Sequence, residues 1–212
     1  TALHWAAYRD DTVLAKQLLG LGANASTENR YGINPLYLAC LNGNADLVAA
    51  LLAAGADANS TARGGETALM TAARTGKTDS ITALIDAGAD VDAKERGGQT
   101  AIMWAAAEGH TEVVKALIEA GADFTTPMER SGFTPFFFAI RSGQAEVVRL
   151  FLEKGVDVNA VMAHERSSGR LPMRGTSPLI LAIENGHYDL AVELPDAGAN
   201  PNDDRSGYTP LH

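Results

Sequence analysis

The chain has 212 residues, of which 46% are hydrophobic and 20% are charged, so it contains enough apolar material for a buried core and is not typical of a disordered protein. Its 17 basic and 26 acidic side chains give a formal net charge of −9, which argues against a general nucleic-acid-binding or anionic-membrane surface. The longest unbroken apolar run, Leu47–Ala54, is far shorter than the roughly 20 residues of a membrane helix, and the single cysteine, Cys40, excludes an internal disulfide and a cysteine-rich metal site.

A four-residue motif recurs along the whole chain: Thr, Ser or Asn, then Ala or Pro, then Leu, Ile or Phe, then a variable residue. It starts at Thr1, Asn34, Thr67, Thr100, Thr134, Ser177 and Thr209. A second motif, Gly followed by Ala or Val and then by Asn or Asp, recurs in step with the first, at Gly22, Gly55, Gly88, Gly121, Gly155 and Gly198. Two independent motifs that share one period indicate a repeat protein.

Each repeat is expected to form two short helices and a turn. Thr or Ser at the start can cap the first helix, and a following Pro suits its first position. In the second repeat, apolar residues over 36–40 supply the buried side of the first helix, which ends near Gly43. Leucine and valine over 47–52 then form the stripe of a second helix, which Gly55 ends. Helices this short are marginal alone, so neighbouring repeats must stabilise one another.

These motifs resemble those of the ankyrin repeat family, whose unit of about 33 residues carries a Thr-Pro-Leu-His signature and a Gly-Ala-Asp-Val-Asn ending. Thr209–His212 matches the signature outright, whereas the variants at Thr67 and Trp104 look more like bacterial members. The resemblance covers essentially the whole chain. It implies a single all-α domain over 1–212, a solenoid of about six helix-turn-helix units with β-hairpin or loop fingers. It also implies a concave groove lined by hairpins and first helices, and a non-catalytic binding role.

The chain departs from the pattern in three places. It begins and ends inside the signature, with a partial seventh unit from Thr209, so we expect a fragment of a longer array. Extra residues lengthen the segment 161–176 into an elongated hairpin, which either lies on the binding face or is merely a tolerated loop. Pro195 stands where other repeats have Leu or Ile and predicts a second helix that ends early or kinks.

Arginine recurs at fixed positions of the repeat. Four residues before the start of a unit, the hairpins carry Arg30, Arg63, Arg96, Arg130 and Arg205. The ends of first helices carry Arg9, Arg74 and Arg141, and the insertion adds Arg166, Arg170 and Arg174. Guanidinium groups suit carboxylates and are enriched in interfaces, so this pattern predicts a surface for a partner with acidic groups. Alternatively, arginine is simply favoured at this turn and pairs with a neighbouring acid such as Glu95, Glu129 or Asp204.

Aromatic residues extend the predicted surface. By their place in the repeat, four of them should point toward the hairpins or groove: Tyr8, Tyr31, Phe133 and Tyr208. Tyrosine together with arginine is typical of binding hot spots. Phe137 is a further candidate for exposure, whereas Phe136 and Phe138 are expected in the core. Trp5 and Trp104 share one helix position and are expected to pack between neighbouring helices.

The sequence contains no convincing catalytic, cofactor or metal motif. Arg74–Thr78 matches only the tail of a phosphate-binding loop, lacks the first glycine and joins two expected helices. The family resemblance assigns His4, His110, His187 and His212 a structural role in bonding loops between units.

We therefore predict a soluble, monomeric, non-enzymatic module, cytoplasmic or exported from a bacterium, with no cofactor or metal. It should bind another protein that has an acidic surface, and neither nucleic acid nor a membrane. Two alternatives are a targeting segment of a larger enzyme and a structural spacer that assembles with itself.

Overall fold

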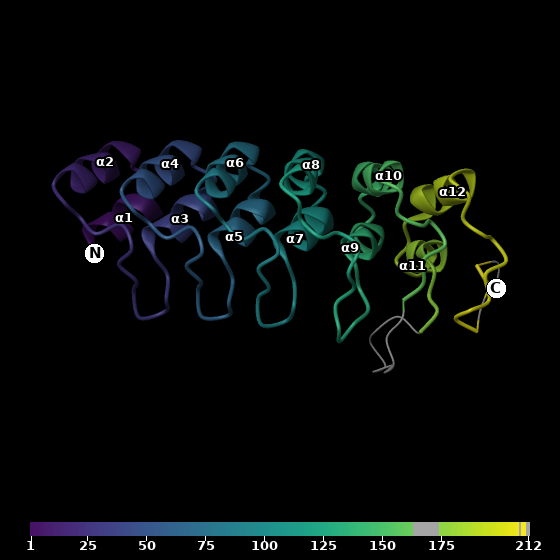
Figure 1. The fold of residues 1–212 in the computed structure, drawn as a ribbon. Coiled ribbons are helices and arrows are strands. Elements are labelled where there is room, and N and C mark those ends of the chain that lie inside the picture. Colours follow the sequence, from purple (N-terminus) through teal and green to yellow (C-terminus); the bar gives the residue numbers. More distant parts are fainter. Residues whose placement is uncertain (163–173, 208, 211–212) are drawn as a thin grey trace. The chain divides into compact units, whose positions relative to one another are not determined.

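The computed structural model describes residues 1–162, 174–207 and 209–210, and this part of the chain contains helices and no strand (Figure 1). The first helices of the successive repeats are α1 (Ala2–Tyr8), α3 (Pro35–Asn42), α5 (Ala68–Thr75), α7 (Ala101–Glu108), α9 (Pro135–Arg141) and α11 (Pro178–Glu184). The second helices are α2 (Thr12–Gly20), α4 (Ala45–Ala53), α6 (Thr78–Asp86), α8 (Thr111–Glu119), α10 (Ala145–Glu153) and α12 (Tyr188–Asp196). The predicted all-α class is therefore confirmed.

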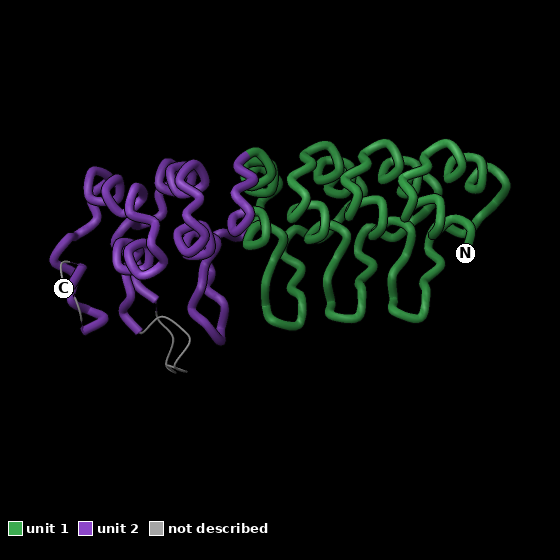
Figure 2. The backbone as a smooth tube through the Cα atoms, turned by 180° about the vertical axis from the view of Figure 1, so that it is seen from behind, with its two compact units in different colours: residues 1–105, 112–122 green, residues 106–111, 123–212 purple. Residues whose placement is uncertain are grey.

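The chain divides into two compact units (Figure 2). Unit 1 comprises residues 1–105 and 112–122, and unit 2 comprises residues 106–111 and 123–212. In unit 1, α1, α3 and α5 form one layer, α2, α4 and α6 form a second layer, and the loops extend beyond the first (Figure 1). In unit 2, α9 and α11 lie beneath α10 and α12 in the same way.

The residue that opens the motif caps a first helix in five repeats, whereas the buried Thr100 hydroxyl before α7 has no hydrogen-bond partner among the described residues. The Thr1 and Thr67 hydroxyls and the Asn34 carboxamide each accept the backbone N–H three residues later, and Thr134 and Ser177 do the same. Proline follows at the first helical position in α3, α9 and α11. At the other end of α3, Gly43 adopts a left-handed conformation with φ 69°, which its lack of a Cβ permits. The sequence motif therefore sets the start and end of these helices, as predicted.

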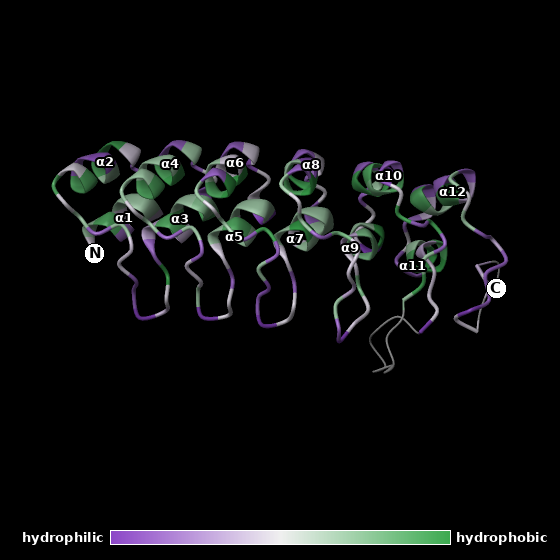
Figure 3. Ribbon diagram, in the orientation of Figure 1, coloured by the Kyte–Doolittle hydropathy of each residue, from purple (hydrophilic) through white to green (hydrophobic). Residues whose placement is uncertain are grey.

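The core of each unit lies between its two helical layers. Leu47, Val48 and Leu51 of α4 are fully buried, as is Cys40 of α3. Burial raises the pKa of the Cys40 thiol to about 12, so the thiol stays protonated at neutral pH and acts as a small apolar side chain. Figure 3 shows hydrophobic residues concentrated in the helices, whereas the loops of unit 1 are mainly hydrophilic.

Histidines link successive repeats, as the resemblance implied. His4 Nε2 donates to the Ile33 carbonyl at 2.9 Å, in the loop that leads to the second repeat. In unit 2, His187 Nε2 donates to the Arg141 carbonyl at 2.8 Å, at the end of the preceding first helix. The structural role predicted for His4 and His187 is confirmed.

The early helix end predicted at Pro195 is wrong. Helix α12 runs nine residues to Asp196, the same length as α4, α6 and α10. Pro195 is the penultimate residue and is exposed, and the turn beyond it keeps its own bond from Ala199 N–H to the Leu194 carbonyl at 3.0 Å. A proline so close to the end removes one hydrogen bond without blocking a further turn, because the helix stops there in any case.

The packing predicted for Trp5 is also wrong. Its ring is 63% exposed and meets Tyr8 edge-on, with centroids 5.8 Å apart. The equivalent Trp104 is half-buried, because the guanidinium group of Arg74 from the preceding repeat lies 5.3 Å above its ring.

The 161–176 insertion falls largely outside the described residues, which resume at Arg174. Its flanks are paired: Met162 N–H donates to the Thr176 carbonyl at 3.1 Å, and Gly175 N–H donates to the Met162 carbonyl at 2.9 Å. The single domain, the elongated hairpin and the partial seventh unit from Thr209 stay predictions.

Candidate protein-binding surface

The hairpins of unit 1 share one conformation. Each is closed by a backbone bond across its base: Asn29 to Ile33 at 2.9 Å, Ala62 to Glu66 at 2.9 Å, and Glu95 to Gln99 at 3.0 Å. A second bond in each runs to the first residue of the base from a glycine with positive φ: Gly32, Gly65 and Gly98. Arginine two residues before this glycine therefore occupies the same place in all three hairpins.

Neighbouring hairpins of unit 1 also touch. Arg96 N–H donates to the Gly64 carbonyl of the preceding hairpin at 2.8 Å. A Cβ added to Gly65 would lie 3.4 Å from the Glu95 Cα, and one added to Gly32 would lie 3.6 Å from the Arg63 nitrogen. This backbone contact keeps successive hairpins in register, so Arg30, Arg63 and Arg96 lie at equivalent points of adjoining loops.

The three hairpin arginines of unit 1 are exposed, and among the described residues none of them forms an ion pair. Glu95 stands beside Arg96, but its carboxylate accepts the Gly97 and Gln99 backbone N–H groups at 2.7 and 3.0 Å. The guanidinium group of Arg30 lies 4.8 Å from the ring centroid of Tyr31, which is 52% exposed. The neighbouring-acid pairing considered for these arginines is therefore not formed at Arg96.

The ends of the first helices add apolar side chains to this region. Tyr8 on α1 is 61% exposed, and Leu41 at the equivalent position of α3 is 43% exposed. Arg74 occupies this position on α5 and is half-buried. Leu41 was not among the predicted site residues, although its place in the repeat is identical to that of Tyr8 and Arg74.

In two repeats the base of the hairpin meets the end of the following first helix. In unit 1, Arg74 forms an ion pair with Glu66, the residue just before the Thr67 cap, at 3.7 Å. In unit 2, the guanidinium group of Arg141 lies 5.1 Å from the ring of Phe133, which has the same place before Thr134. Two different side-chain pairs make the same contact, so hairpin base and helix end belong to one continuous face of the repeat.

The predicted exposure of Phe133 and Phe137 is wrong, since each is 2% exposed. Arg141 covers Phe133 and also stacks 4.9 Å from the ring of Phe138. Partial burial of Arg141 against these rings lowers the pKa of its guanidinium group. Phe133 therefore belongs to the core, and Arg141 serves as its cover.

Arg205 is engaged inside unit 2. Its guanidinium group binds the Asp203 carboxylate at 2.8 and 2.6 Å and donates to the Asn159 carbonyl at 2.8 Å. Asp203 is 3% exposed, and its hydrogen bonds from Arg205 lower the pKa of its carboxyl group. Arg205 therefore neutralises a buried acid in the last turn of the described chain.

We expect Asp203→Asn to lower the free energy of unfolding at pH 7 by about 1–2 kcal/mol, through loss of a charge-assisted hydrogen bond. Because the folded-state pKa of Asp203 is lowered, its contribution is present above the unfolded pKa of about 3.9 and disappears as pH falls through the folded value. Urea unfolding from pH 7 to about pH 2 should therefore show the two proteins converging in acid. A difference that does not change with pH would contradict this assignment.

The remaining predicted site residues are either exposed or outside the described part of the chain. Arg9, Arg130 and Arg174 are exposed. Arg166, Arg170 and Tyr208 lie outside the described residues. Across the described ranges, no group of three or more His, Cys, Asp and Glu side chains could hold a metal ion. None of the helices found there is both long enough and apolar enough to span a membrane.

Tandem two-helix units with hairpins held in register define a helical repeat protein. A sequence model of ankyrin repeats (3 copies) matches residues 3–95 and 93–162, so the chain belongs to the ankyrin repeat family. Members of this family generally act in protein–protein interaction.

Solved ankyrin repeat domains share the fold. The human ASB11 domain superposes with a TM-score of 0.85 at 24% identity, and covers 100% of this chain and 90% of its own. The ankyrin repeat domain of Bcl-3, described as a unique member of the IkappaB protein family, superposes with a TM-score of 0.79 at 29% identity, covering 100% and 92%. Among curated proteins, none matches the chain by sequence.

Proposed function

We propose that the chain is a monomeric, non-catalytic module that binds another protein through one face of unit 1. This contact face consists of Tyr8, Arg30, Tyr31, Leu41, Arg63 and Arg96. The observation that carries the proposal is the recurrence of exposed arginine at one point of three adjoining hairpins, without ion pairs among the described residues. Exposed aromatic and leucine side chains on the same repeats supply apolar area.

The chemistry of this face favours a partner that presents carboxylates beside apolar groups. A solvent-exposed ion pair contributes only about 0–1 kcal/mol, so the arginines chiefly orient and attract the partner. Burial of tyrosine and leucine supplies most of the affinity, as in other hot spots. The chain carries a net charge of −9, so an acidic partner is attracted locally by the arginines rather than by the protein as a whole.

The variant Arg30→Gln/Arg63→Gln/Arg96→Gln should keep the fold and weaken partner binding, with a smaller dependence on salt. All three side chains are exposed, so their removal costs little stability. The partner is the protein retained by the wild-type chain, and its affinity for each variant is measured at low and high ionic strength.

A control with the same change of charge is Lys16→Gln/Lys77→Gln/Lys154→Gln, which removes three exposed lysines outside the contact face. Its affinity and salt dependence should stay close to those of the wild type. An equal loss in both triple variants would show that net charge matters and the hairpin positions do not. Sedimentation that depends on protein concentration would contradict the monomer.

A further inference from the structure

An asparagine side chain links two successive turns of unit 1 through hydrogen bonds. Asn59 stands four residues after Gly55, at the end of a Gly-Ala-Asp motif. Its Nδ2 donates to the Gly88 carbonyl at 2.9 Å, and its Oδ1 accepts the Asp90 backbone N–H at 2.8 Å. The next turn thus offers one acceptor and one donor, two residues apart, that match the two ends of a carboxamide.

The same recognition recurs in unit 2. Asn159 stands four residues after Gly155, and its Nδ2 donates to the Gly198 carbonyl at 2.9 Å. Its Oδ1 accepts the Asn200 backbone N–H at 2.8 Å. The distances match those at Asn59, so the carbonyl and N–H of the following turn form the same carboxamide receptor at these two junctions, whereas Ser26 and Asp92 hold the equivalent position at two others.

At one place in unit 2 this carboxamide is missing. Thr125 occupies the equivalent position after Gly121, and its hydroxyl and N–H both bond back to the Asp123 carboxylate, at 3.0 and 2.9 Å. The receptor groups that an asparagine would engage belong to Gly155 and Asp157. Among the described residues, neither the Gly155 carbonyl nor the Asp157 N–H has a hydrogen-bond partner.

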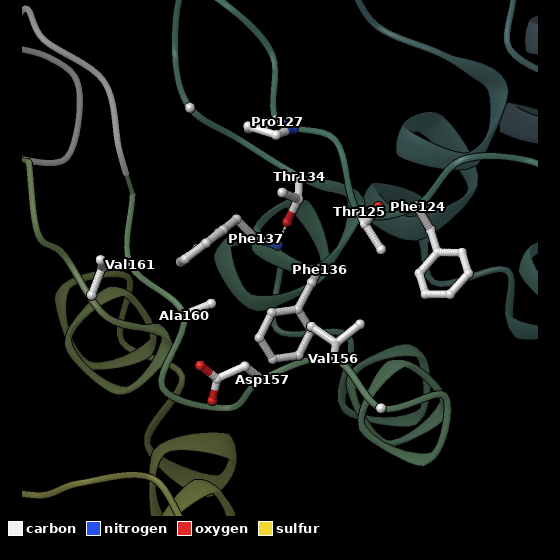
Figure 4. A pocket seen from close by; sticks show the side chains of 12 residues that line it. Phe124, Thr125, Pro127, Thr134, Phe136, Phe137, Val156, Asp157, Ala160 and Val161 are labelled. Atoms are coloured by element: carbon white, nitrogen blue, oxygen red, sulfur yellow. Dashed lines mark hydrogen bonds between the residues drawn. The ribbon is translucent and has the colours of Figure 1, made fainter.

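A cavity of about 320 Å³ lies beside Thr125, where this asparagine side chain is missing (Figure 4). Phe124 and Thr125 line it from one turn, Gly155 and Asp157 from the next, and Phe136 forms part of its apolar wall. Engineered apolar cavities of about 150 Å³ already admit benzene, so this cavity has room for a carboxamide together with the apolar group that carries it.

We propose that this cavity binds the side-chain carboxamide of an asparagine or glutamine on a protein partner. The amide oxygen accepts the Asp157 N–H and the amide nitrogen donates to the Gly155 carbonyl, as Asn59 and Asn159 do at their own receptors. This inference rests on the proposed function only for the statement that the ligand belongs to a protein.

The same groups disfavour an acidic ligand. A carboxylate has no donor for the Gly155 carbonyl and would bring a second negative charge to the Asp157 side chain, which also lines the cavity. One Asp157 carboxylate oxygen already accepts the Asn159 N–H at 2.8 Å, so this acid is held in place. The receptor is therefore selective for a neutral amide over an acid of the same shape.

Benzamide serves as the probe, because it joins a primary carboxamide to a ring that the cavity can hold. In a titration followed by ¹H–¹⁵N NMR, we expect saturable shifts of the Asp157 and Val156 amide signals, which report on the two receptor groups. Benzoate should bind at least tenfold more weakly. Benzoate binding as tight as benzamide, or no response to benzamide up to its solubility limit, would overturn the proposal.

Two variants separate the receptor from nonspecific binding to the turn. Thr125→Asn should place the missing carboxamide on the receptor and abolish the benzamide response. Thr125→Val adds no carboxamide and should keep it, and a benzamide response that persists in Thr125→Asn would overturn the assignment. Because the probe is not a protein, this result stands apart from the arginine variants that test the contact face of unit 1.

Discussion

Phe151→Ala is expected to lower the free energy of unfolding by about 3–5 kcal/mol, the usual cost of removing a buried phenylalanine. Phe151 of α10 is fully buried. Its ring stacks on Phe124 with centroids 5.9 Å apart and meets Phe136 edge-on at 6.3 Å, so one side chain joins a turn, a first helix and a second helix of unit 2. Its loss leaves a void and removes two aromatic contacts.

The measurement is chemical denaturation followed by circular dichroism. Repeats are stabilised by their neighbours, so we expect unit 2 of the variant to unfold at a lower denaturant concentration than unit 1, with two transitions. Val192→Ala on α12 is the control, since Val192 is 72% exposed and its truncation should change the unfolding free energy by no more than about 0.5 kcal/mol. Equal effects of the two substitutions would contradict close packing around Phe151.

Tyr8→Ala/Tyr31→Ala is expected to weaken partner binding by about 30-fold or more, which corresponds to a hot-spot loss of about 2 kcal/mol. Both rings are more than half exposed in the free protein, at 61% and 52%, so the fold does not depend on them. Burial of aromatic area is insensitive to salt, so this loss should be the same at low and high ionic strength. The arginine variants should instead show a salt-dependent loss.

Calorimetric titration of the captured partner measures this effect, and thermal unfolding checks that the fold is intact. Tyr188→Ala is the matched control, because Tyr188 on α12 is 67% exposed but lies outside the contact face. Binding that Tyr188→Ala weakens as much as the double variant would show that the partner docks elsewhere.

The repeat architecture was predictable because its signals are local. The Thr67 hydroxyl caps a helix whose own backbone N–H it accepts, and Gly43 ends a helix through its own backbone conformation. Such interactions span a few residues, so a motif repeated at a constant spacing is enough to place them. The same reasoning located Arg30, Arg63 and Arg96 at one point of successive hairpins, where the structure has them.

Whether a side chain can contact a partner depends instead on its packing against other residues, both within its own repeat and in the neighbouring repeat. Arg74 and Arg141 share a helix position with Tyr8, yet Arg74 binds Glu66 and covers Trp104, and Arg141 covers Phe133. These partners are eight to 30 residues away in sequence, and an equivalent position elsewhere does not reveal them.

Sequence was therefore sufficient for the family, the helices and the repeat register of this protein, since capping and glycine turns are short-range. The three-dimensional packing alone decided that Phe133 is core, that Arg205 neutralises Asp203, and that Thr125 leaves a cavity beside Gly155. Burial and hydrogen-bond satisfaction are properties of neighbours in space, and in a repeat protein these neighbours come from the adjoining unit.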